Sequence, residues 1–405
     1  MKIVVDQVVL GDEKESSLRE IEISSPFLNS STSKLSVEKA FAYFPFINAH
    51  DHLIGNWYPP ARNSSLYPNA NIWVKDMKLS PSVKERDKVF VNSIPMSFLK
   101  ENGPLLALLG GYKNIFSGVG VVQDHAPIQQ DEYYDLFPIE VLRKYRQLHS
   151  ITLGNFWGGE EPLQEMEASK GEMPFIVHLG EGLDETTKGE FSKLYEIGLL
   201  KPNTLIIHGI SLTKRELHMC ADTGASVCWC PFSNYALIGQ TLDIDTCLSI
   251  GVNVVIGTDS TLSGSINLLS EISYAHQKAP HIPAKTLYKM ISSHSAKALF
   301  LDKEKYALQE KNNENILLVK AKAKDPYSNI LKITPDDIIF FMWQGVPIYG
   351  QLKYLEHFSI EKDDYYTYTK EGTERFVKGH PEKIIDRIDS ILGYHKTLPY
   401  LPFQG

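Results

Sequence analysis

Phe46-Ile47-Asn48-Ala49-His50-Asp51-His52 places two histidines two residues apart at the end of an apolar run. Side chains i and i+2 of a β-strand point to the same face of a sheet. Two imidazoles side by side at a strand end can therefore bind one metal ion. A His-x-His pair arises easily by chance, so its meaning depends on what the rest of the chain places beside it.

Apolar strands alternate with helical segments from this point on. We predict eight strands that are apolar on both faces: Ala42–Asn48, Gly118–Gln123, Phe137–Arg143, Ser150–Gly154, Pro174–His178, Thr204–His208, Ala225–Cys230 and Val252–Gly257. Such strands, separated by helices, predict a parallel sheet buried on both sides. Eight of them over this length predict an α/β fold, a (β/α)8 TIM barrel.

The pattern changes on either side of this barrel. Short β-prone segments are Ile3–Leu10, Arg19–Ile23, Asn315–Val319, Asp337–Trp343 and Val346–Tyr349. We expect residues 1–40 and 310–405 to form a small discontinuous β-sheet domain, and residues 41–309 to form the barrel. Residues 350–405 include an expected helix at Pro381–Leu392, and this tail is expected to pack on the barrel or on a partner subunit, which leaves a homodimer open.

Composition excludes several classes of protein. The chain has 405 residues, 43% hydrophobic and 22% charged, which is typical of a soluble globular protein. A formal net charge of −8 argues against nucleic acid and anionic membranes as partners, because both bind clustered Lys and Arg. The four cysteines lie close together between Cys220 and Cys247, which is no disulfide framework and favours a cytoplasmic location.

Four predicted strand ends carry metal-ligand types. The strands of a barrel all deliver their last residues to one face. The first end gives His50 and His52; the fifth gives His178 with Glu181; the sixth gives His208; the eighth gives Asp259. Any one buried histidine is usually a hydrogen-bonded core residue, but this combination at one mouth predicts a metal site.

Three neutral imidazoles and one carboxylate suit Zn²⁺ or Fe²⁺ rather than Ca²⁺ or Mg²⁺. Such an ion lowers the pKa of water from 15.7 to roughly 7. Asp259 can ligate the ion and accept the proton of the water. Glu181 can carry that proton to a leaving group, and His208 can polarise the substituent of the attacked carbon or hold the water.

These motifs resemble the amidohydrolase superfamily, and within it the mononuclear deaminase and chlorohydrolase-like branch. The resemblance covers about residues 42–300. The matching segments are His50-Asp51-His52, His178-Leu179-Gly180-Glu181, His208, Cys230-Pro231-Phe232-Ser233-Asn234, Asp259 and Leu268-Leu269-Ser270-Glu271. The resemblance implies one Zn²⁺, with Fe²⁺ as the alternative, held by His50, His52, His178 and Asp259, with catalytic roles for Glu181, His208 and Asp259.

The chain departs from the family in a few places. Dinuclear members carry a bridging Lys or Glu at the end of strand four, and Ile151–Trp157 has neither, so the resemblance implies a single metal ion. Phe44-Pro45-Phe46-Ile47-Asn48-Ala49-His50 lacks the glycine of the usual entry to strand one. The N-terminal module is also short.

Other residues carry weaker signals. Trp57, His125, Trp157 and Asn234 follow strand ends, and we expect them to line the substrate pocket, although packing within the loops explains them equally well. Cys228 and Cys230 lie in a predicted strand and are interpreted as small hydrophobic residues, not zinc ligands. The remaining histidines, His149 among them, are interpreted as surface or core residues.

Three functions fit these residues. The leading hypothesis is a metal-dependent hydrolase of carbon–nitrogen bonds other than peptide bonds, which deaminates a small nitrogen heterocycle. The second is hydrolysis of a cyclic amide or of another ring leaving group at the same site. The third is a barrel that binds a small molecule without catalysis, which the intact ligand set disfavours. Specificity lies in the loops after the strands, so the substrate itself is not predicted.

Overall fold

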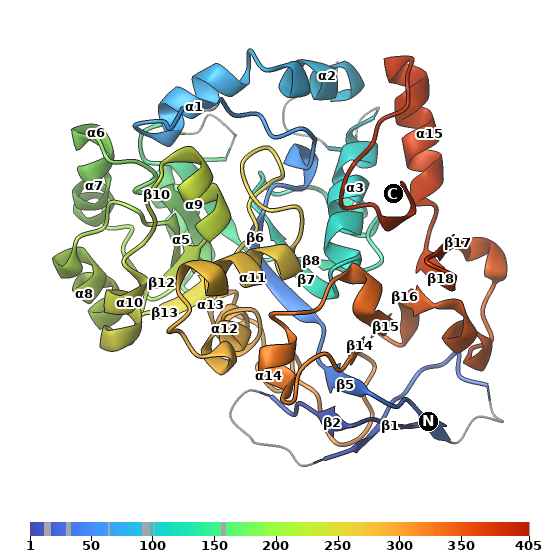
Figure 1. Ribbon diagram of the computed structural model, residues 1–405. Helices are drawn as coiled ribbons and strands as arrows, with labels where there is room; N and C mark the ends of the chain where they lie inside the picture. Colours follow the sequence, from blue (N-terminus) through green and yellow to red (C-terminus); the bar gives the residue numbers. More distant parts are fainter. Residues whose placement is uncertain are drawn as a thin grey trace.

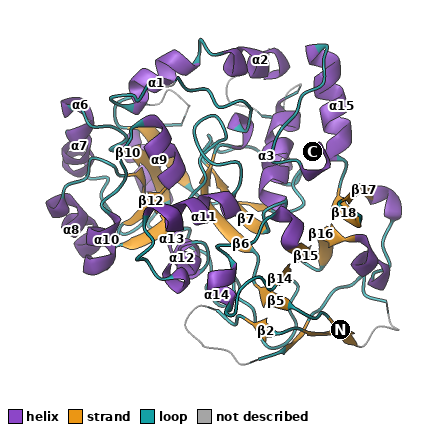
Figure 2. Ribbon diagram, viewed as in Figure 1, coloured by secondary structure: helices purple, strands orange, loops and turns teal. Residues whose placement is uncertain are grey.

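Eight parallel strands form a (β/α)8 barrel at the centre of the protein, with helices around them (Figures 1 and 2). The computed structural model describes residues 1–11, 18–29, 34–63, 65–90, 98–99, 102–154 and 159–404. The barrel strands are β6 (Phe46–Asp51), β7 (Val119–Asp124), β8 (Glu140–Val141), β9 (Arg146–Ser150), β10 (Phe175–Leu179), β11 (Thr204–His208), β12 (Ser226–Trp229) and β13 (Asn253–Ile256). Six of them are buried along their whole length, as expected of strands covered on both faces.

The barrel strands pair as two parallel sheets, β6-β7-β8 and β9-β10-β11-β12-β13. One seam brings the first strand beside the last. The backbone N–H of Asp259, just after β13, donates to the carbonyl oxygen of His50 on β6 at 3.2 Å. This seam places the ends of strands one and eight in direct contact, and both ends carry predicted ligands.

Fifteen α-helices occur among the described residues, and none of them is both long enough and apolar enough to cross a membrane. They are α1 (Ala70–Met77), α2 (Pro81–Phe90), α3 (Gly103–Ile115), α4 (Asp131–Tyr134), α5 (Pro162–Ser169), α6 (Glu185–Lys188), α7 (Glu190–Ile197), α8 (Lys214–Thr223), α9 (Pro231–Leu237), α10 (Ile244–Ile250), α11 (Leu268–Lys278), α12 (Ala284–Met290), α13 (Ser293–Ala298), α14 (Pro326–Asn329) and α15 (Pro381–Leu392). In Figure 1, α6, α7, α8 and α10 lie on one outer side of the barrel, and α1 and α2 lie across its top.

A second, seven-stranded sheet combines both ends of the chain, in the order β17-β18-β16-β15-β14-β5-β2. Its strands are β2 (Gln7–Val8), β5 (Ala40–Tyr43), β14 (Ile316–Lys320), β15 (Ile338–Trp343), β16 (Val346–Gln351), β17 (Tyr365–Lys370) and β18 (Thr373–Lys378). A three-stranded sheet adds β1 (Lys2–Val4), β3 (Glu20–Glu22) and β4 (Lys34–Ser36). The proposed boundaries at residues 40 and 310 stay predictions.

The predicted first strand, Ala42–Asn48, is wrong as one element. The chain forms β5 in the small sheet and then β6 in the barrel, with Phe44 and Pro45 between them. Proline has no backbone N–H, so Pro45 cannot donate to a neighbouring strand and the ladder stops there. Pairing resumes at Phe46, whose N–H donates to the carbonyl oxygen of Gly118 at 2.9 Å.

The predicted fourth strand, Ser150–Gly154, is displaced. The strand is Arg146–Ser150, and a turn follows in which the Gly154 N–H donates to the Ser150 carbonyl oxygen at 2.9 Å. Arg146-Gln147-Leu148-His149 lacks the continuous apolar run on which the prediction depended. Two of its polar side chains contact histidines of the site described next, Gln147 with His125 and His149 with His178. The true strand end also lacks a Lys or Glu.

Candidate metal centre and active site

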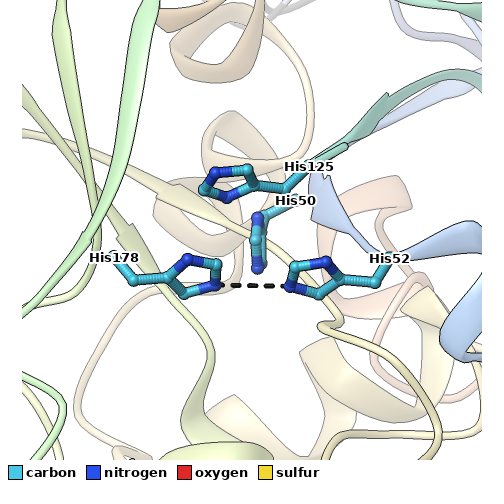
Figure 3. A group of neighbouring side chains, drawn as sticks. All are labelled: His50, His52, His125 and His178. Atoms are coloured by element: carbon cyan, nitrogen blue, oxygen red, sulfur yellow. Dashed lines mark hydrogen bonds between the residues drawn. The ribbon is translucent and has the colours of Figure 1, made fainter. Parts of the chain in front are cut away.

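Four histidines meet at the carboxyl ends of the first, second and fifth barrel strands. His50 lies on β6 and His52 directly follows it, His125 follows β7, and His178 lies on β10. One ring nitrogen from each lies within 4.8 Å of the others. Figure 3 shows His52 and His178 facing each other, with His50 seen nearly edge-on between them and His125 above. The structure thus brings three predicted ligands together and adds His125 to them.

A hydrogen bond orients one of these imidazoles. His178 Nδ1 lies 2.8 Å from the carbonyl oxygen of His149, so this nitrogen carries the hydrogen and donates it. His178 Nε2 then presents a lone pair to His52 Nε2 at 3.3 Å (Figure 3). A ligating histidine is usually fixed in this way, through a backbone carbonyl on its other nitrogen.

The donor set fits a divalent metal ion. Neither ring nitrogen of the fully buried His50 has a hydrogen-bond partner among the described residues. Burial lowers the pKa of His50, His52, His125 and His178, which keeps the rings neutral as metal binding requires. A buried imidazole without a partner costs free energy unless a ligand supplies the interaction.

Asp259 lies beside the histidine cluster. Its Oδ1 is 3.7 Å from His52 Nε2 and 4.0 Å from His50 Nε2. Its Oδ2 accepts hydrogen bonds from the hydroxyls of Ser233 at 2.8 Å and Ser263 at 2.6 Å. Burial raises the pKa of Asp259, but His52, His208 and the two hydroxyl donors outweigh it, so the net shift is downward. The carboxylate is therefore ionised and held in place for a cation.

Glu181 and His208 form a second pair next to this cluster. Glu181 Oε2 lies 3.5 Å from His208 Nε2, and His208 Nδ1 contacts the side-chain oxygen of Asn234 at 2.8 Å. Because an amide oxygen only accepts, His208 carries its hydrogen on Nδ1 and leaves Nε2 as an acceptor. Burial raises the pKa of Glu181 to about 7. Glu181 is thus able to give or take a proton near neutral pH.

Helix α9 supports both groups. Ser233 binds Asp259 and Asn234 binds His208, so one helix orients the carboxylate and the imidazole together. Glu271 on α11 accepts from the backbone N–H of Phe232 at 2.9 Å and fixes the start of α9. His208 and Asp259 also have positive φ angles of 73° and 54°, a strained conformation that clusters at functional sites.

A cavity of about 320 Å³ opens over this site. Its floor includes His52, His178, Glu181, His208 and Asp259. Its apolar wall is formed by Ile54, Trp73, Val74, Met77, Val83, Leu153 and Leu262. Polar residues that also line it are Asn69, Asn71, Thr152 and Glu190, and Lys78, Arg86 and Asp87 add charge. The cavity therefore fits a flat apolar group with polar substituents.

The three predicted substrate contacts that the structure describes fall elsewhere. Trp57 is fully buried away from the cavity, where its Nε1–H donates to Glu85 at 3.0 Å and its ring lies under the Lys396 ammonium. His125 belongs to the histidine cluster, and Asn234 lies behind His208; both are fully buried. Trp157 lies outside the described residues. Following a strand end is thus not enough to reach the cavity, because a side chain there also turns outward or behind its neighbours.

Two residues that line the cavity, His149 and Glu190, were not predicted from the sequence. His149 lines the cavity, and its ring lies 5.0 Å from that of His178. The fourth strand was predicted at the wrong position, so the place of His149 near the end of that strand was not recognised. Glu190 also lines the cavity; it accepts from the Gly180 N–H at 2.8 Å and the Thr152 hydroxyl at 2.6 Å. An acidic residue in the first turn of a helix gives no such signal, because capping explains it.

One protein family and two solved structures are similar to this chain. Residues 163–350 match the amidohydrolase family. The adenosine deaminase of Xanthomonas campestris, solved with bound zinc, has a TM-score of 0.64 at 16% identity, covering 85% of this chain and 92% of that one. The atrazine chlorohydrolase of Arthrobacter aurescens, complexed with zinc, also gives 0.64 at 16% identity, covering 96% and 99%. These likenesses show the fold.

Curated relatives match a shorter part of the chain than the solved structures do. The 5-methylthioadenosine/S-adenosylhomocysteine deaminase of Pyrococcus furiosus is 32% identical over 152 residues, 33% of this chain and 36% of that protein. The aminodeoxyfutalosine deaminase of Deinococcus radiodurans is 32% identical over 97 residues, 24% of this chain and 23% of that protein. The matched part thus spans about a third or less of the length of these relatives.

Fold and site together define a (β/α)8 barrel with a histidine-rich centre for a divalent metal ion. Part of the chain, residues 163–350, is similar to the amidohydrolase family, and the two solved structures share its barrel fold.

Proposed function

We propose that this protein is a metal-dependent hydrolase that removes the amino group of a nitrogen heterocycle, with an adenine-type nucleoside as the substrate class. The observation that carries this proposal is the joint placement of the histidine cluster, Asp259 and the Glu181–His208 pair on the floor of one cavity. The names of the curated relatives, which are deaminases of adenine nucleosides and a related compound, support the substrate class.

His50, His52, His178 and Asp259 are the proposed ligands of one ion, with His125 closing the cluster beside them. Nitrogen donors with one carboxylate favour zinc, and iron(II) is the alternative. When bound, such an ion makes hydroxide available at neutral pH.

The protein's own side chains handle the protons. Asp259 is ionised, so its Oδ1, which also accepts from the Ser260 N–H at 2.7 Å, can take a proton from the attacking water. Glu181, with a pKa of about 7, can donate its own proton to a ring nitrogen, and it can then pass the proton taken from water to the departing amine. His208 Nε2, fixed by Asn234, faces the same space and can accept a hydrogen bond from the amino group. Water and the aminated ring are consumed, and the hydroxylated ring and ammonia are formed.

The cavity wall orients the ring. Trp73, Val74 and Met77 offer an apolar surface, whereas Asn71, Thr152 and Glu190 offer hydrogen-bond partners for a polar substituent such as a sugar. The proposal includes a small-molecule substrate. It also includes a cytoplasmic location, because all four cysteines are free and buried. A homodimer stays a prediction.

The ligand set is tested by metal analysis of His178→Ala and Asp259→Ala. We expect the wild-type protein to hold one metal ion and both variants to lose most of it. Stoichiometric metal in the variants would show that the ligands are wrong. Ser249→Ala, on the exposed side of α10, is the control and should bind metal as the wild type does.

The reaction is tested with a panel of adenine nucleosides, aminopyrimidines, aminotriazines and cyclic amides. Deamination predicts ammonia release from an aminated ring, abolished by a chelator and restored by Zn²⁺. Ring opening or loss of another group without ammonia would favour the second hypothesis. Binding of panel members without turnover by metal-loaded protein would favour the non-catalytic barrel.

A further inference from the structure

A fully buried lysine lies directly behind the metal centre. Lys113 is in the last turn of α3, outside the barrel, and its side chain has no exposure to solvent. Its Nζ lies 3.2 Å from the carboxylate of Asp51, 2.8 Å from Asn56 Oδ1, 3.1 Å from Thr258 Oγ1 and 2.8 Å from the carbonyl oxygen of Asp259. Three hydrogens thus serve four acceptors, two from the end of β6 and the turn after it and two from the segment after β13.

These acceptors flank the proposed ligands on both sides of the barrel seam. Asp51 lies between His50 and His52 on β6, and Asn56 lies in the loop that follows. Thr258 precedes Asp259, and the carbonyl that Lys113 binds belongs to Asp259 itself. One ammonium therefore joins the paired histidines to the aspartate.

Two asparagines complete the arrangement. Asn114, the next residue on α3, donates to Asp51 Oδ2 at 2.9 Å. Asn48 on β6 donates to Asn114 Oδ1 and to Thr258 Oγ1, each at 2.9 Å, and accepts from the Thr258 N–H at 3.2 Å. All of these side chains are buried. The strand-one end and the strand-eight end are thus held by a closed polar network.

Stability alone does not account for such a network. Burying an ion pair costs a large desolvation free energy, and well-packed apolar residues in its place often stabilise a protein equally or better. A polar network fully satisfied in a core does fix geometry, and groups that orient metal ligands affect metal affinity strongly. The placement around the ligands therefore favours a role in their geometry.

We propose that Lys113, through Asp51 and the Asp259 carbonyl, is the positioning residue that sets the distance between the His50–His52 pair and Asp259. Lys113 touches neither substrate nor metal in this role. The inference rests on the proposed metal centre, and it extends that centre to a helix on the outside of the barrel.

The test measures metal affinity and coordination. Lys113→Met removes the ammonium, and Thr258→Val removes one of its acceptors at nearly constant volume. Thr258→Ser keeps the hydroxyl and is the matched control. We expect a zinc dissociation constant, measured by chelator competition, raised about 10–100-fold by Lys113→Met. Thr258→Val should raise it in the same direction, while Thr258→Ser stays near the wild-type value.

Two further measurements separate positioning from simple stability. The visible absorption spectrum of the Co²⁺-loaded protein should change in Lys113→Met and Thr258→Val, because ligand geometry changes, and should be preserved in Thr258→Ser. A purely structural role would lower the melting temperature of metal-free and metal-loaded protein equally, with the affinity and the spectrum unchanged. That result overturns the inference.

The outcomes distinguish this inference from the function on which it rests. If the wild-type protein binds no divalent metal, the proposed function is wrong and this inference falls with it. If the wild type binds metal and the variants bind it equally well, only the positioning role is wrong. If Lys113→Met does not fold, Thr258→Val against Thr258→Ser decides the question.

Discussion

Two buried carboxyl groups at the site have opposite protonation behaviour. Burial raises the pKa of Glu181 to about 7, whereas imidazoles and hydroxyl donors bring that of Asp259 below its usual value despite burial. Neighbouring acids whose pKa values are moved apart divide the tasks of acid and base between them. We therefore propose that Glu181 donates protons and that Asp259, ionised before the reaction, accepts one.

Glu181→Gln should lower kcat by about 10²–10⁴-fold, because the proton donor is lost, with metal content unchanged. Since Glu181 must be protonated to donate, the wild-type rate should fall as the pH rises through about 7, and this limb should be absent from the variant. Glu185→Gln, at an exposed side chain nearby, should leave kcat unaltered. A variant within tenfold of wild type would remove Glu181 from the mechanism.

Glu271 predicts a pH dependence of stability. Burial raises its pKa from 4.5 to about 8, so the folded protein binds a proton there that the unfolded chain has lost. The contribution of this residue to the free energy of unfolding therefore falls as the pH rises from about 4.5 to about 8, by at most about 1.4 kcal/mol per pH unit. Above pH 8 both states are ionised and the slope vanishes.

Urea unfolding of the wild type and Glu271→Gln across pH 5–9 measures this. Glutamine cannot ionise but can still accept from the Phe232 N–H, so the variant should gain in stability relative to wild type as the pH rises. If the free energies of unfolding of the two proteins changed with pH in parallel, Glu271 would be ionised in the folded protein, and the prediction would be wrong.

Sequence patterns predicted some residues of the site and missed others. His50, His52, His178, Glu181, His208 and Asp259 were predicted because each ends or closely follows a continuous apolar strand. Lys113 was not, since a lysine within an outer helix normally points to solvent, and only the folded barrel shows that its chain passes inward. His125 was noticed for its place after a strand, but its direction, toward the other histidines, depends on tertiary packing.

At the scale of elements, α2 couples the cavity to the C-terminal segment. Val83 and Arg86 on α2 line the cavity, and Glu85 between them accepts from Lys396 and from Trp57 Nε1–H. The Lys396 ammonium also lies 4.7 Å from the centre of the Trp57 ring. The C-terminal segment thus fixes a helix that forms one wall of the pocket.

Lys396→Met should raise KM more than it lowers kcat, because it displaces the cavity wall and leaves the metal centre in place. It should also cost about 1–3 kcal/mol of stability, since Glu85 loses a charged partner in a mostly buried position. Lys378→Met removes a more exposed ion pair with Asp364 and should change stability by less than about 0.5 kcal/mol. Steady-state kinetics and urea unfolding measure both effects; an unchanged KM would contradict the coupling.

Strands could be predicted from the sequence where all of their residues are buried. The strands that deliver His178 and His208 are continuous apolar runs, and their predicted bounds differ from β10 and β11 by at most one residue at each end. The hairpin β17–β18 was not predicted, because alternating Tyr, Thr and charged residues on a half-exposed sheet resemble a polar tail. Local sequence does not show which neighbour covers a strand.

Metal binding and the stability of the whole molecule are linked. The ion proposed here binds residues from strands one, five and eight, so it connects distant parts of the closed barrel. Ligand binding to the native state alone stabilises it by RT ln(1 + [L]/Kd), about 2.7 kcal/mol at a hundredfold excess over Kd. We expect a chelator to lower the melting temperature and added Zn²⁺ to restore it, whereas His178→Ala protein should respond to neither. An unchanged wild-type melting temperature would contradict this.

The hydrogen bond from the Tyr400 hydroxyl to the carbonyl oxygen of Asn56, at 2.7 Å, joins positions 344 residues apart in the sequence. Asn56 follows the very strand that carries the paired imidazoles. Because synthesis proceeds from the N-terminus at about 5–20 residues per second, the loop after that strand waits tens of seconds for its partner to leave the ribosome. Truncated nascent chains should consequently expose this loop to proteases until translation has passed position 400.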